Sequence, residues 1–87
     1  MQQDAAQENP KKLFVGNLSF NTTRETVESI FSEYGTLTDV ALIIDRMSGR
    51  SKGIAFVTFE TQEQAQAAIE ALNGFEVDGR ELIVNVA

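Results

Sequence analysis

The eight residues Lys52–Phe59 alternate between two kinds of side chain, and this alternation constrains the fold more than any other feature of the chain. Successive side chains of a β-strand point to opposite faces of a sheet. One face of this strand therefore receives small and apolar side chains that suit a core, while the other receives Lys52, Ile54 and Phe56. A large ring beside a cation on an open sheet is suited to stacking on a nucleobase while the cation binds phosphate.

The hydrophobic periodicity of the chain predicts the element order strand-helix-strand-strand-helix-strand. The two helices carry apolar stripes that begin at Val27 and Ala65. This order predicts an α+β fold, the ferredoxin-like split βαβ sandwich (βαββαβ), with a four-stranded antiparallel sheet and two helices on one face. The strands are predicted over residues 13–18, 40–44, 52–59 and 82–86. The apolar residues predicted for the open face are Phe14, Ile43, Ile54, Phe56 and Ile83.

Local signals predict where the helices begin and end. Thr22 and Thr61 are each followed three residues later by Glu or Gln, which predicts a capping box at the start of each helix. Gly35 is predicted to end the first helix in a left-handed conformation. Residues 45–51 are polar and cationic and contain a glycine, so they predict a hairpin-like connection between two strands.

Several segments of the chain resemble the RNA recognition motif family. Lys52–Phe59 fits the pattern [KR]-G-x-[GA]-[FY]-V-x-[FY] with one substitution, and Leu13–Leu18 resembles the partner signature strand. The Asp-Arg-x-x-Gly-Arg-Ser-Lys-Gly segment at residues 45–53 and the closing residues 79–87 are similar to the same family. The resemblance covers about residues 12–87. It implies a module that binds about two to four nucleotides of single-stranded RNA on the sheet.

The resemblance also implies roles for individual residues. In the family, three outward rings stack on bases, and by position they fall on Phe14, Phe56 and Ile54. The family typically has Phe or Tyr at position 54, so the isoleucine implies weaker or differently placed binding. Lys52 corresponds to the phosphate-binding cation, and Asn85 to a residue that reads base edges. The residues predicted to bind RNA are Lys12, Phe14, Arg50, Lys52, Ile54, Phe56 and Asn85, with Arg46 as a further candidate for phosphate.

The distribution of charge leaves two functions open. A net charge of −6 is unusual for nucleic-acid binding, which favours a basic surface. Five of the seven cations nevertheless flank the two signature strands, and most acidic residues fall on the helical segments. This distribution predicts a basic rim beside the open face. The acidic balance and Ile54 favour the alternative, a protein–protein interaction module that uses the same apolar sheet face.

Length and composition argue against several other classes of protein. A chain of 87 residues permits one small domain, with the polar residues 1–10 as a flexible leader and residues 11–87 as the RNA recognition motif domain. Without histidine or cysteine the commonest catalytic groups are missing, so we expect no enzymatic activity, metal or cofactor. No apolar run approaches the roughly 18 residues of a membrane span. We expect an intracellular monomer. The sequence does not indicate the cellular compartment, and it leaves single-stranded DNA as an alternative ligand to RNA.

Overall fold

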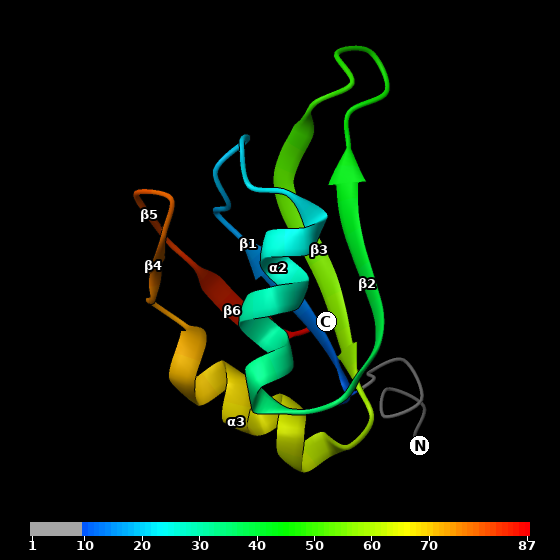
Figure 1. The fold of residues 1–87 in the computed structure, drawn as a ribbon, viewed down its shortest axis with the longest axis vertical. Coiled ribbons are helices and arrows are strands. Elements are labelled where there is room, and N and C mark those ends of the chain that lie inside the picture. The colour runs from blue at the N-terminus through cyan, green and yellow to red at the C-terminus, as the bar shows by residue number, and fades with distance from the viewer. Residues whose placement is uncertain (1–9) are drawn as a thin grey trace, which may run out of the picture.

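The computed structural model describes residues 10–87. These residues form a four-stranded antiparallel sheet with two helices packed against one of its faces (Figure 1). The strand order β2-β3-β1-β6 places β3 and β1 at the centre. The predicted split βαβ sandwich is confirmed, and the leader predicted over residues 1–10 lies, apart from Pro10, outside the described residues. The elements are β1 (Lys12–Gly16), α2 (Arg24–Phe31), the 3₁₀ turn η1 (Ser32–Tyr34), β2 (Leu37–Ile44), β3 (Ser51–Phe59), α3 (Gln62–Leu72), β4 (Glu76–Val77), β5 (Arg80–Glu81) and β6 (Ile83–Val86).

The register of the sheet aligns residues from all four strands. Phe14 of β1 lies opposite Phe56 of β3 on one side and opposite Asn85 of β6 on the other. Phe56 in turn lies opposite Ala41 of β2. Because paired residues in an antiparallel sheet point to the same face, these four residues form one row across the sheet. The row lies on the face away from the helices, since the neighbouring strand positions are the buried ones.

The other face of the sheet and the two helices enclose the core. Every second residue of β3, from Ser51 to Phe59, is buried, which confirms the predicted alternation. The rings of Phe31 on α2 and Phe59 on β3 lie with their centroids 6.5 Å apart. Burial of one such side chain contributes about 1.5–3 kcal/mol to stability. The core also contains Leu13, Val15, Val40, Ala55, Val57 and Val84 from the sheet, Val27, Ala65, Ala68 and Leu72 from the helices, and Leu18, Val77 and Leu82.

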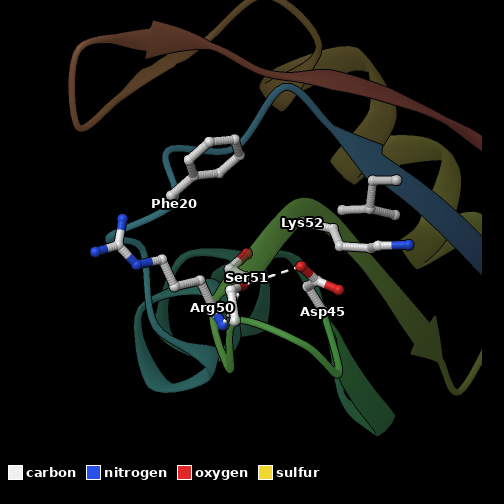
Figure 2. Close-up of a pocket in the computed structure, with 7 residues that line it drawn as sticks. Phe20, Asp45, Arg50, Ser51 and Lys52 are labelled. Carbon is white, nitrogen blue, oxygen red and sulfur yellow. Dashed lines mark hydrogen bonds between the residues drawn. The ribbon is translucent and has the colours of Figure 1, made fainter.

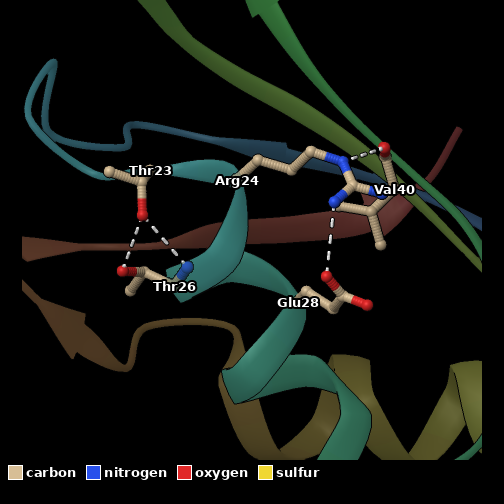
Figure 3. A network of polar contacts seen from close by, with 5 residues as sticks. All are labelled: Thr23, Arg24, Thr26, Glu28 and Val40. Atoms are coloured by element: carbon tan, nitrogen blue, oxygen red, sulfur yellow. Dashed lines mark hydrogen bonds and ion pairs between the residues drawn. The ribbon is translucent and has the colours of Figure 1, made fainter.

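Helix α2 begins one residue later than the sequence pattern predicts. Thr23 is its N-cap, and the Thr23 hydroxyl accepts a hydrogen bond from the Thr26 amide at 3.2 Å (Figure 3). The predicted cap, Thr22, is 2% exposed, and its hydroxyl donates to Oδ2 of Asp78 at 2.7 Å. The prediction of Thr22 as the cap is therefore wrong. The Thr22 hydroxyl, which the pattern assigns to a helix amide, instead bonds to Asp78, 56 positions away in sequence.

Arg24 connects helix α2 to the edge of the sheet. Its Nε donates to the carbonyl of Val40 at 3.1 Å, and its Nη1 forms an ion pair with Glu28 at 3.3 Å (Figure 3). β2 is an edge strand, and the outward carbonyls of an edge strand lack a partner from another strand. The guanidinium therefore satisfies one exposed acceptor of β2 and fixes the start of α2 beside it.

The ends of the helices agree with the prediction in part. Gly35 has φ 158° and ψ −178°, which lies outside the left-handed helical region, so the predicted left-handed cap is wrong. Residues with a side chain rarely adopt this backbone conformation, and a Cβ at Gly35 would also lie 2.5 Å from the side chain of Gln64 on α3. Helix α3 has the predicted N-cap, Thr61, whose hydroxyl accepts from the Gln64 amide at 3.2 Å. No helix within residues 10–87 has the length and apolar character needed to cross a membrane.

A short hairpin between α3 and β6 is absent from the predicted element order. Val77 of β4 pairs with Arg80 of β5 across Asp78 and Gly79. Both turn residues have positive φ, 51° and 84°, the combination that a type I′ turn requires. Asp-Gly is a strong hairpin signal, but strands of two residues are too short to show an alternating pattern.

Candidate nucleic-acid interface

Two phenylalanine rings lie at the centre of the open face. Phe14 of β1 and Phe56 of β3 are partly exposed, and their ring centroids lie 5.9 Å apart with an angle of 63° between the planes. Phe31 and Phe59, by contrast, are buried. The two rings therefore point outward, as predicted, and form an adjacent pair that solvent can reach.

The residues two positions to either side of Phe14 fit closely around this pair. A Cβ at Gly16 would lie 2.8 Å from Cε2 and 3.0 Å from Cζ of Phe14, so the Phe14 ring lies over the glycine. Nζ of Lys12 lies 5.1 Å from the centroid of the Phe56 ring. A cation at this distance attracts the ring by about 0.5–1 kcal/mol at an exposed site. This attraction favours the position of Lys12 over the Phe56 ring.

The rows on either side of the ring pair differ in polarity. Ile54 on β3 and Ile83 on β6 extend the apolar surface on one side, and Ile83 is 47% exposed. On the other side Thr58 lies opposite both Lys12 and Asp39. The open face is therefore apolar from its centre toward Ile54 and Ile83 and becomes polar and charged toward Lys12.

A depression of about 480 Å³ lies at the apolar end of the face, where the loop between β2 and β3 begins. Figure 2 shows Phe20 and Arg50 on one side of it and Lys52 and Asp45 on the other. Three of the residues predicted to bind RNA meet here, whereas Arg46, exposed in the same loop, does not line the depression. The lining residues are Phe20, Asp45, Ser48, Arg50, Ser51, Lys52 and Ile54.

Asp45 organises the β2–β3 loop and sets the charge of the depression. Its Oδ2 accepts from the Ser48 hydroxyl at 3.0 Å and its Oδ1 from the Met47 amide at 3.3 Å. The bond from Ser48, followed by that from Met47, holds the pKa of Asp45 below its ordinary value, and the positive charge of Lys52 lowers it further. The carboxylate is therefore ionised at neutral pH and offsets part of the positive charge of Lys52 and Arg50.

Three residues of the open face and its rim were not predicted as part of it. Asp39 belongs to the face because β2 begins at Leu37, whereas the predicted strand begins at Val40. Ala41 lies within the predicted strand but was not named among the residues of the open face. Irregular register within β2 interrupts the alternation that marks a strand. Phe20 is 59% exposed and lies between the strand predicted over residues 13–18 and the first helix. Its signal in the sequence is an aromatic residue among polar neighbours.

Sequence comparison connects this chain with named proteins. The family model for the RNA recognition motif matches residues 13–83. The chain is 55% identical over 76 residues to glycine-rich RNA-binding protein 1 of Mycosarcoma maydis, a match that covers 87% of this chain and 43% of that protein. It is 46% identical over 76 residues to a glycine-rich RNA-binding protein of Daucus carota, with 87% of this chain and 48% of that protein covered. The chain thus spans less than half the length of these relatives.

Solved structures share the fold. A chain of the Sxl-lethal protein/RNA complex superposes with a TM-score of 0.86 at 34% identity, covering 91% of this chain and 48% of that one. The structure of the RNA15 RRM with bound RNA (GU) superposes with a TM-score of 0.81 at 27% identity, covering 88% of this chain and 82% of that one. Family model, relatives and fold agree, and the chain belongs to the RNA recognition motif family.

Proposed function

We propose that this domain binds single-stranded RNA on the open face of its sheet. The observation that carries the proposal is the row across the four strands, in which Phe56, Phe14 and Asn85 are adjacent on the face away from the core. Two neighbouring rings on a solvent-facing sheet have no packing role in the core. The RNA-binding names of the relatives and the RNA present in two of the similar structures support the same ligand.

Each residue of the site has a distinct part in the proposed binding. Successive bases stack on Phe14 and Phe56, and each stack contributes about 1–3 kcal/mol. Ile54 covers a base or sugar by apolar contact. The side-chain amide of Asn85 can both donate to and accept from a base edge at the end of the row. The RNA backbone runs along the basic rim of the open face. The cations of this rim that bind phosphates are Lys52, Arg50, Arg46 and Lys12.

Lys12 has to change its contacts when RNA binds. Its ammonium lies over the Phe56 ring, where a stacked base would lie. The cation–π contact is worth less than a base stack, and the lysine stem is flexible, so the ammonium can move to a neighbouring phosphate. Lys12 therefore covers the ring in the free domain and binds the backbone in the complex.

Alanine substitution of the two rings tests the proposal directly. Phe14→Ala and Phe56→Ala should each weaken binding of a short single-stranded RNA by about 1–3 kcal/mol, measured by titration at low salt. Phe75→Ala is the matched control, because Phe75 is 50% exposed but lines a separate depression with Ile30 and Tyr34. Ring variants that bind RNA as tightly as this control would contradict the proposal. A ring variant that unfolds would show that the ring belongs to the core.

The dependence of binding on salt gives an independent test. Binding to single-stranded nucleic acid weakens as salt rises, with a slope of about 0.7 for each phosphate contacted. Four cations lie near the proposed path of the backbone, and Asp45 offsets part of their charge, so we expect a shallow slope. Binding that does not change with salt would show that the face recognises something other than a polyanion.

A protein partner is the second candidate for the same face. The observations that favour it are the net charge of −6 and the aliphatic residues Ile54 and Ile83 beside the rings. If the wild-type domain shows no RNA binding at low salt, this alternative takes precedence. A single-stranded DNA of the same sequence, titrated in parallel, separates recognition of the 2′-hydroxyl from stacking alone. In either case the proposed activity is binding without chemical conversion of the ligand.

A further inference from the structure

We propose that the depression beside Ile54 holds a further nucleotide, whose base stacks on the ring of Phe20. This inference rests on the proposed RNA binding and extends it beyond the sheet. The loop between β1 and α2 then supplies the aromatic surface that position 54 lacks.

The position of the Phe20 ring is the first argument. A Cβ at Gly53 would lie 3.4 Å and 3.7 Å from two carbons of the Phe20 ring, so the ring lies over this glycine. Gly53 stands between Lys52 and Ile54 in β3. Phe20 lines the same depression as Lys52 and Ile54, so its ring is near the strand positions that would carry a phosphate-binding cation and a stacking residue. With 59% of its surface exposed, it offers a large apolar area to a ligand.

The loop that carries Phe20 is fixed at both ends, which is the second argument. Before Phe20, the Leu18 amide donates to the Gly53 carbonyl at 3.0 Å. After it, the buried hydroxyl of Thr22 donates to Asp78 at 2.7 Å, and the Thr22 amide donates to the Ser19 carbonyl at 3.0 Å. A ring on a loop that is already ordered binds a base at a lower entropic cost than a ring on a mobile one.

The size and charge of the depression indicate a nucleotide as the occupant. Its volume of about 480 Å³ lies within the range typical of small-molecule sites. Phe20 and Ile54 supply apolar surface for a base, while Arg50 and Lys52 supply positive charge for the adjoining phosphates (Figure 2). Because Ile54 also borders the Phe56 ring along β3, an RNA on the sheet continues into the depression without a gap.

Two RNAs of different length separate this site from the sheet. The first has about three nucleotides and fills the sheet alone, and the second has about seven and extends past it. Phe20→Ala should weaken binding of the longer RNA about 5-fold or more and leave the shorter RNA unaffected. The control is again Phe75→Ala, a substitution of another exposed phenylalanine elsewhere on the surface. If Phe20→Ala binds the longer RNA as tightly as this control does, the inference is wrong.

The outcomes distinguish this inference from the proposed function. If the wild-type domain binds neither RNA, both are overturned. If Phe14→Ala weakens both RNAs and Phe20→Ala weakens neither, only the Phe20 site is overturned.

A second variant keeps the test decisive if Phe20→Ala fails to fold. Phe20→Trp retains an aromatic ring and adds a single fluorophore, because the chain has no tryptophan of its own. The longer RNA should quench its fluorescence by stacking, and the shorter RNA should leave it unchanged. Binding of the longer RNA without any change in this fluorescence would overturn the inference.

Discussion

The glycine beneath the Phe14 ring offers a way to move that ring without removing it. In Gly16→Ala, the new methyl would lie 2.8 Å from Cε2 of Phe14, so the ring edge must retreat by 0.6 Å (3.4 − 2.8) to reach ordinary contact. Cε2 is at the far end of the side chain, and a small rotation costs less than about 1 kcal/mol. Gly16 is not among the glycines with positive φ, so its backbone accepts alanine. We expect a folded domain with a displaced ring.

The expected loss of RNA affinity follows from the size of this displacement. Removing a stacking ring altogether costs about 1–3 kcal/mol, and this value sets the upper limit for moving it. A tilted ring keeps part of its contact with the base. We therefore expect Gly16→Ala to weaken binding by about 0.5–1 kcal/mol, or about 2- to 5-fold in Kd.

A double-mutant cycle tests whether the effect acts through the ring. Binding isotherms for the wild type, Gly16→Ala, Phe14→Ala and the double variant are measured with one short RNA at fixed low salt, and thermal unfolding is followed in parallel. If the alanine methyl acts by displacing the ring, it should cause no further loss once Phe14 is already alanine. Equal losses in both backgrounds would refute the reasoning, because the glycine would then matter for another reason.

Three further substitutions probe other parts of the structure. Ile54→Phe should tighten binding of a short RNA by up to about 1 kcal/mol, since it adds a π-face beside Phe56, and unchanged affinity in a folded variant would favour a protein partner. Asp45→Asn should tighten RNA binding about 2-fold at low salt, and less at high salt, because it removes a negative charge near Lys52; weaker binding would mean that the loop geometry dominates. Thr22→Val should lower the free energy of unfolding by about 1 kcal/mol, seen as a fall of about 4–8 °C in Tm, because it removes the hydrogen bond from the buried Thr22 side chain to Asp78; an unchanged Tm would show that this bond contributes nothing.

The fold was predictable where a strand or helix buries one face, because its apolar residues then recur at regular intervals in the sequence. β3 shows this most clearly, since its five inward positions are all buried. The features that the sequence did not reveal depend on contacts between distant residues. The capping-box pattern favours Thr22, but the Thr22 hydroxyl bonds to Asp78 and Thr23 caps the helix. At Gly35 a Cβ would lie 2.5 Å from the side chain of Gln64 on the other helix, a contact that the local sequence does not indicate.

The candidate site was also predictable only where its features depend on local sequence. The outward direction of Phe14 and Phe56 follows from strand alternation, which is a local property. The depression does not follow from a local property. It forms where the loop bearing Phe20 meets β3, and neither segment alone indicates that the two lie side by side. The strand position of Ile54 was predicted, but its proximity to Phe20 became visible only in the folded chain.

The order of strands in the sheet also has a consequence for synthesis of the protein. Among the described strands, β1 leaves the ribosome before the others, and its two neighbours, β3 and β6, are made much later. The pair β2 and β3 can form early as a hairpin, whereas the apolar strand β1 must wait for both partners. The row from Ala41 to Asn85 is therefore complete only when β6 has emerged. A nascent chain lacks the finished surface until translation has passed almost the whole domain.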